Sequence, residues 1–306
     1  MNKDLLKMIE QLAECLESDL DISEKGLTEL PSALFKLSHL ETLFLDENQL
    51  TAIPKEINQL SQLKHLDISN NQLLYLTPEI AQLFKLEELY IENNQLAMLT
   101  PDIGKLSQLK KLNLSENQLI ALPHEFAQLS QLKELDLSHN QLITVPPEIL
   151  QLPKLKELDL SGNPLTAVPP ELFQLTQLKS LNLSNTQLKD LPSEFSQLSR
   201  LKDLDLSLNQ LKILPSSLCQ LTRLKELYLN ENEIEVLPSQ MAQLSRLEWL
   251  DIRDNQLTSL PSTFSQLSEL EWLLLEGNPL PIPSHILELA EEPENIINNY
   301  MKTLKG

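Results

Sequence analysis

The stretch "LKELDLSHNQL" at residues 132–142 decides how this chain folds, because close copies of it recur along the sequence. They read "LKHLDISNNQL" at 63, "LKKLNLSENQL" at 109, "LKELDLSGNPL" at 155 and "LKDLDLSLNQL" at 201. All copies are separated by multiples of 23 residues, and the same register defines twelve units. A fixed period of this length indicates a solenoid in which each unit forms one coil.

Within each unit the order of residue types predicts the local structure. A full unit reads LxxLxLxxNxLxxLPxxIxQLxx. The leucines at positions one, four and six place apolar side chains on one face of a short strand, and strands of successive coils must run parallel. Neighbouring coils bury each other's leucines, so the two ends need caps. The proline in the second half favours an extended or short helical segment over a second ladder strand.

The asparagine at position nine is the most regular polar residue of the unit. The chain turns sharply there, and a buried carboxamide can donate to and accept from backbone groups of adjacent turns. We therefore predict a ladder of stacked asparagines, in which Lys25 and Thr186 fill the same register. The predicted ladder consists of Asn48, Asn71, Asn94, Asn117, Asn140, Asn163, Asn209, Asn232, Asn255 and Asn278.

Both ends of the chain carry the helical periodicity expected of caps. Residues 1–16 have apolar residues at helical spacing and predict an N-terminal capping helix, and residues 17–283 form the repeats. Residues 284–306 predict a C-terminal capping helical segment, in which Pro293 occupies a helix-start position. The apolar face of that segment comprises Ile296, Ile297, Tyr300, Met301 and Leu304.

These units resemble the leucine-rich repeat family over almost the whole chain. The 23-residue period with LPxxI is similar to the intracellular class found in Ras-group, Scribble and Erbin type, and bacterial Roco proteins. The resemblance implies an α/β solenoid: a horseshoe with twelve 23-residue coils, a parallel β-sheet on the concave face and helical caps at both ends. It also implies a protein-binding module in signalling or scaffolding. An alternative is the repeat region of a larger signalling enzyme, such as a Roco-type GTPase, or of a bacterial effector.

The opening stretch also holds residue types of a hydrolase, namely Asp136, Ser138 and His139. Asp136 and Ser138 occupy repeat positions five and seven, where several other coils also carry aspartate and serine. Histidine occurs at its repeat position only in this coil, as His139. Neighbouring residues of a strand point to different faces, so the three need not converge. No HExxH, GxxxxGK[ST], GxGxxG, GxSxG or CxxC motif occurs. We predict a protein that is not an enzyme, with no catalytic residues, cofactor or metal.

Charge narrows the choice of partner. The formal net charge is -20 and the pI is near 4.6, which disfavours nucleic acid and anionic membranes and favours a protein with a basic or mixed-charge surface. Lysines at position two run beside acidic residues at positions three and five, and these stripes either neutralise each other or form a template for a partner. The start "MNKDLLKMIEQLAECLESD" lacks the continuous apolar core of a signal peptide, which predicts a cytoplasmic protein.

Aromatic residues mark the candidate binding site on the concave face. The only two tryptophans occupy position three of adjacent units, with a tyrosine, an arginine and a leucine nearby. Such a composition is typical of an interaction hot spot, although the C-terminal cap could instead cover the rings. A second, weaker cluster lies near the N-terminus. The predicted partner-binding residues are Tyr228, Trp249, Asp251, Arg253, Trp272 and Leu274, followed by Phe44, His65 and Tyr90.

Overall fold

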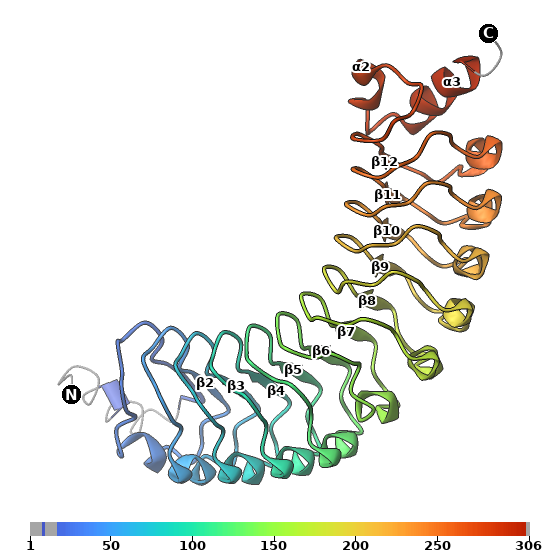
Figure 1. Cartoon of the computed structure of the whole chain (residues 1–306). Coiled ribbons are helices and arrows are strands. Elements are labelled where there is room, and N and C mark those ends of the chain that lie inside the picture. The colour runs from blue at the N-terminus through green and yellow to red at the C-terminus, as the bar shows by residue number, and fades with distance from the viewer. Residues whose placement is uncertain (1–7, 10–16, 304–306) are drawn as a thin grey trace. The chain divides into compact units, whose positions relative to one another are not determined.

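The computed structural model describes residues 8–9 and 17–303 of the chain (Figure 1). These residues divide into two compact units. Unit 1 holds the described residues up to Leu142 together with Pro146–Leu155, and unit 2 holds Ile143–Val145 together with the described residues from Lys156 onward. Each unit is a stack of coils in which the strand order follows the chain. The expected solenoid of parallel strands is confirmed.

Every strand has three residues, which are positions three to five of the repeat. In unit 1 they are β1 (Asp19–Asp21), β2 (Thr42–Phe44), β3 (His65–Asp67), β4 (Glu88–Tyr90), β5 (Lys111–Asn113) and β6 (Glu134–Asp136). In unit 2 they are β7 (Glu157–Asp159), β8 (Ser180–Asn182), β9 (Asp203–Asp205), β10 (Glu226–Tyr228), β11 (Trp249–Asp251) and β12 (Trp272–Leu274). Within each unit, residues 23 apart are direct neighbours on adjacent parallel strands, as Trp249 and Trp272 are.

The second half of each coil forms a short 3-10 helix. These helices are η1 (Leu34–Lys36), η2 (Lys55–Gln59), η3 (Pro78–Gln82), η4 (Pro101–Lys105), η5 (His124–Gln128), η6 (Ile149–Gln151), η7 (Pro170–Gln174), η8 (Ser193–Gln197), η9 (Ser216–Gln220), η10 (Ser239–Gln243) and η11 (Ser262–Gln266). In most coils the repeat proline precedes the helix, whereas in η3 and η4 it is the first helical residue. Proline is compatible with both places, because its ring fixes a suitable φ and no internal N–H is lost.

The core lies between the strands and the 3-10 helices. The leucine at position four of each repeat is buried, as Leu135 and Leu250 are. Each coil adds a phenylalanine, isoleucine, leucine or methionine from its helix, such as Phe126. Each coil therefore covers the apolar side chains of the next, and burial of this kind contributes about 25 cal/mol per Å² of apolar surface.

The asparagine ladder is present in both units. The Asn140 side-chain NH₂ donates to the carbonyls of Leu114 at 2.9 Å, Leu137 at 3.0 Å and Ser138 at 3.1 Å. Its Oδ1 accepts from the Leu119 N–H at 2.9 Å. One carboxamide thus satisfies backbone groups of its own coil and of the coil before it, as the sequence predicts.

Thr186 interrupts the ladder in unit 2. Its hydroxyl donates to the Leu183 carbonyl at 2.7 Å. The Leu165 N–H, which would meet an asparagine at this place, bonds instead to the carbonyl of Asn163 at 2.7 Å. The backbone therefore adjusts locally where the carboxamide is replaced.

The C-terminal cap consists of α2 (Ser284–Leu287) and α3 (Pro293–Thr303). Helix α3 lies against η11 and buries Ile296, Ile297 and Tyr300, as predicted. The Tyr300 hydroxyl accepts from the Leu260 N–H at 3.0 Å, and the Ala290 carbonyl accepts from the Leu273 N–H of β12 at 2.9 Å. The predicted N-terminal capping helix lies outside the described residues apart from Met8 and Ile9, and Leu304 lies outside them as well.

Candidate functional site

The residues of the opening stretch have structural roles. The carboxylate of Asp136 accepts from the backbone N–H of Ser138 at 2.8 Å, and the same bond joins Asp67 to Ser69 at 2.9 Å in an earlier coil. These bonds form the turn that ends each strand. Position seven of the repeat is buried in five coils, at Ser69, Ser115, Ser138, Ser161 and Ser207.

His139 is a turn residue. It has φ of 52°, and position eight is left-handed in every coil that carries this turn in the described part of the chain. Asparagine, aspartate, histidine and glycine tolerate this conformation best. His139 lies on the surface, while Asp136 and Ser138 are joined within the turn by the bond from the Ser138 N–H. The three residues thus occupy places that the repeat gives to the same positions of other coils.

The charged side chains at positions two and three pair along their columns. Lys64 lies 2.6 Å from Glu41, and Lys110 contacts Glu87 at 2.5 Å. At position three, Lys111 Nζ lies 2.8 Å from Glu134. In-register parallel strands place equal positions about 4.8 Å apart, so a residue meets its equivalent in the next coil first. Opposite charges on the sheet thus neutralise each other in part, and they do so between equal repeat positions of successive coils.

An aromatic row crosses β10, β11 and β12 on the side of the sheet that points away from the core, which we call the open face. Trp249 and Trp272 stack with ring centroids 4.8 Å apart and planes 27° apart. Tyr228 lies on the other side of Trp249 with a centroid distance of 6.3 Å. The row forms because both tryptophans occupy position three, and the register brings them together. All three rings are partly exposed.

Acidic groups surround the aromatic row. The Tyr228 hydroxyl donates to Glu226 at 2.8 Å, and partial burial followed by this bond raises the pKa of Tyr228. Burial also raises the pKa of Asp203, with a further contribution from Glu226. Lys225 pairs with Glu248 at 2.5 Å. The row is therefore an apolar strip beside an excess of carboxylates.

Arg253 and Asp251 form the polar border of the row. Asp251 is only 2 % exposed, so its role is to hold Arg253 rather than to meet a partner. The guanidinium donates to the carboxylate through Nε at 3.0 Å and through Nη2 at 2.7 Å. These bonds raise the pKa of Arg253. Leu274 continues the Asp251 column on β12 and is partly exposed.

The position of the cap bears on whether the tryptophans are accessible. Helix α3 contacts η11, on the far side of the coil from the open face, and both indole rings keep partial exposure. Trp249 Nε1 is covered and donates to no acceptor within the described part of the chain. A covered donor without an acceptor costs about 1 to 3 kcal/mol, so this row is not optimised for stability alone.

The second predicted cluster lies on the open face of unit 1. Phe44 is 40 % exposed. His65 Nδ1 lies 3.3 Å from Glu88, and the Tyr90 hydroxyl donates to the same carboxylate at 2.8 Å. Partial burial and this bond raise the pKa of Tyr90. In contrast to the tryptophans, these rings do not stack on each other within the described residues.

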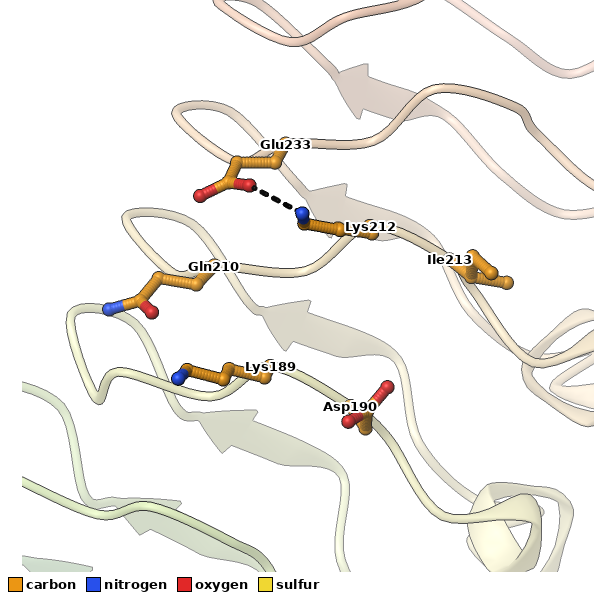
Figure 2. A pocket seen from close by; sticks show the side chains of 6 residues that line it. All are labelled: Lys189, Asp190, Gln210, Lys212, Ile213 and Glu233. Carbon is orange, nitrogen blue, oxygen red and sulfur yellow. Dashed lines mark ion pairs between the residues drawn. The ribbon is translucent and has the colours of Figure 1, made fainter.

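The sequence interpretation missed the flank of the coils, which is the segment between the asparagine turn and the repeat proline. In unit 2 this flank contains a shallow depression of about 440 Å³. Figure 2 shows that its side chains project separately, and one ion pair joins Lys212 to Glu233 at 3.5 Å. Lys189, Asp190, Gln210 and Ile213 complete the lining. The depression lacks any nucleophile held by a base, which acyl or phosphoryl chemistry would need.

Two further searches cover the described residues. No group of three or more histidine, cysteine, aspartate and glutamate side chains there is placed to hold a metal ion. No helix in that part of the chain is long and apolar enough to cross a membrane.

The fold and the site thus define a repeat solenoid of a type that generally serves protein–protein interaction. Sequence comparison supports this class, because the family model described as "Leucine rich repeat" matches residues 18–73, 84–142, 153–211, 192–234 and 222–280. A two-copy model of the same repeats matches residues 130–174. The chain belongs to the leucine-rich repeat family. A search of curated proteins found no match.

Solved structures give the same result. A leucine-rich repeat protein of Leptospira interrogans is 33 % identical over 91 % of this chain and 94 % of its own, with a TM-score of 0.57. The plant peptide hormone receptor RGFR1, solved in complex with RGF2, is 29 % identical over 85 % of this chain and 43 % of its own, with a TM-score of 0.72. An internalin of Listeria monocytogenes is 22 % identical over 97 % and 93 % of the two chains, with a TM-score of 0.74, and shares the fold.

Proposed function

We propose that this chain is a non-catalytic protein-binding module that receives its partner on the open face, which is the concave face of the expected horseshoe. The observation that carries the proposal is the row of Tyr228, Trp249 and Trp272, which remains partly exposed and uncovered by α3. Aromatic side chains held by rigid strands lose little conformational freedom on binding and commonly dominate binding energy.

The charges around the row indicate the chemistry of the partner. Glu226, Asp203 and Glu248 border the rings, and the whole chain carries a formal charge of -20. A basic or mixed-charge protein surface is attracted to such a site, and apolar side chains at the centre of that surface would cover the rings. Arg253 supplies one fixed guanidinium for an acidic group at the edge of the same partner.

The comparisons support the class of function. The receptor RGFR1 was solved with its peptide hormone RGF2, which is consistent with a protein or peptide ligand for this chain. The 23-residue LPxxI unit supports membership of the intracellular class, a cytoplasmic location and a role in signalling or scaffolding. The alternative, a repeat region of a larger signalling enzyme or bacterial effector, would use the same surface. The gene sequence beyond Gly306 would distinguish the two.

The experiment that tests this function starts with affinity capture by the full chain and identification of the captured protein. Its Kd is then measured for the natural chain and for Trp249→Ala and Trp272→Ala. Each substitution is expected to weaken binding by about 2 kcal/mol, or roughly thirtyfold, as central aromatic anchors do. Val236→Ala, an exposed apolar residue on the flank of unit 2, is the control and should leave Kd unchanged.

Folding is followed separately by thermal unfolding of each variant. If both tryptophan variants unfold at lower temperature but bind the captured protein with the natural Kd, the rings stabilise the C-terminal coils and the proposed site is wrong.

A further inference from the structure

The flank of unit 1 exposes large apolar side chains on three successive coils. Leu74 is 57 % exposed, Tyr75 55 %, Met98 69 % and Ile120 65 %. The coils are held side by side by backbone bonds, because the N–H groups of Gln95 and Gln118 donate to the preceding coil at 2.9 Å. The four side chains therefore form one continuous patch, which we call the apolar flank.

The apolar flank lies in a region without charge. Residues 49–54, 72–78, 95–101 and 118–123 contain no aspartate, glutamate, lysine, arginine or histidine, although 22 % of the chain is charged. The equivalent segments of unit 2 at residues 187–192, 210–215 and 233–238 hold Lys189, Asp190, Lys212, Glu233 and Glu235, several of which appear in Figure 2. Residues 164–169 and 256–261 of unit 2 also lack charge, but they expose no large apolar side chain. The flank of unit 1 is therefore distinguished by exposed apolar side chains and the absence of charge together, and such a patch marks an interaction surface.

We propose that the apolar flank is a dimerisation surface that binds the same flank of a second copy of this chain. In a two-fold symmetric contact each patch meets itself, so any charged group near the axis would face its own like charge. An uncharged apolar patch avoids that repulsion. A strongly basic partner would instead be attracted to the carboxylates of the open face, where it gains charge complementarity.

The border of the patch is also complementary to itself. A row of glutamines, Gln49, Gln72, Gln95 and Gln118, runs along the apolar flank and is exposed. A carboxamide both donates and accepts, so a glutamine can hydrogen-bond to the same residue of a second copy. The patch therefore has an apolar centre with a neutral polar border on its glutamine side, beyond which lie the exposed Glu47 and Glu116.

Sedimentation velocity and light scattering of the full chain over a wide concentration range test this proposal. We expect the mass to rise from one chain toward two with concentration. Met98→Glu and Ile120→Glu each place a carboxylate in both copies of the contact and should weaken dimerisation by about a hundredfold or more. The matched control is Ser259→Glu, at the repeat position of Met98 in a coil of unit 2, which should dimerise normally.

Thermal unfolding of each variant establishes that it is folded. We expect both glutamate variants to fold, because Met98 and Ile120 are exposed in the natural chain. A chain that stays monomeric at every concentration would overturn the proposal. A dimer whose association constant is the same in Met98→Glu and Ile120→Glu as in the natural chain would also overturn it. The proposal is independent of the binding site on the open face, so Trp249→Ala is expected to dimerise like the natural chain.

Discussion

At the scale of single residues, the asparagine at position nine joins each coil to the one before it. Asn140 is 6 % exposed and makes four hydrogen bonds to backbone groups. Asn140→Ala would leave these buried groups without partners and is expected to lower the free energy of unfolding by about 1 to 3 kcal/mol. Chemical denaturation measures the loss, and a midpoint equal to that of the natural chain would refute the structural role of the ladder.

Position eight offers a second test, because its backbone is left-handed whatever residue occupies it. Leu208 has φ of 56° and is 46 % exposed, whereas five other coils place asparagine or glycine there. Leu208→Asn should stabilise the protein by about 0.5 to 1 kcal/mol, because asparagine adopts this conformation at a lower cost. Leu208→Ala, which shortens the side chain without this preference, is the control. Equal melting temperatures for the Asn and Ala variants would contradict the backbone explanation.

The residue scale also shows what the sequence could predict. The ten asparagines and the leucine columns follow from a period of 23 and are found in their expected roles. The left-handed turn at His139 was not foreseen, because one unit alone does not reveal its backbone angles. The same holds for Ser138, whose burial follows from the turn that Asp136 holds.

At the scale of the elements, in-register strands align the carboxylates of alternate coils at the same repeat position. Asp205 lies on β9, and its pKa is raised mainly by burial and also by Asp159 and Asp251. Since the pKa of the folded state exceeds that of the unfolded state, the contribution of this group to stability is present below about pH 4 and is lost as pH rises through the raised value.

Asp205→Asn removes this unfavourable charge and is expected to raise the melting temperature at pH 7. The gain should shrink as the pH falls toward 4, where Asp205 itself becomes neutral. Asparagine fits the position, because Asn182 accepts from the Ser184 N–H at 3.0 Å in the neighbouring coil. Asp159→Asn is the matched control, since Asp159 accepts from the Asn182 side chain at 2.8 Å, and it should give no gain. Melting curves across this pH range would contradict the account if Asp205→Asn were destabilising at pH 7.

The arrangement of the elements was largely predictable, and their surfaces were not. The short strands and the helical second half of each coil follow from repeated apolar and proline positions, and the C-terminal cap follows from the helical spacing of its apolar residues. The pairing of charges along columns depends on side-chain contacts between coils, which a single unit does not contain. The apolar flank was visible as apolar residues after the asparagine turn in successive units, but its exposure was known only from the structure.

At the scale of the whole molecule, the two features argued to be functional both lie on the surfaces of the coils. The open face carries charge and one aromatic row, and the apolar flank of unit 1 carries neither charge nor a covering element among the described residues. The two proposed surfaces use different repeat positions, so substitutions can test each one separately. The repeat permits such different surfaces, because the exposed side chains at one repeat position can change from coil to coil without altering the fold of the coil.

The central claim is that the aromatic row binds the partner, and tryptophan fluorescence tests it most directly because both tryptophans of the chain lie in the row. In the free protein we expect acrylamide to quench the emission, since both rings are partly exposed. Saturation with the captured partner should shift the emission to shorter wavelength and reduce the quenching. Emission that resists acrylamide in the free protein and does not change when the partner binds would contradict the account.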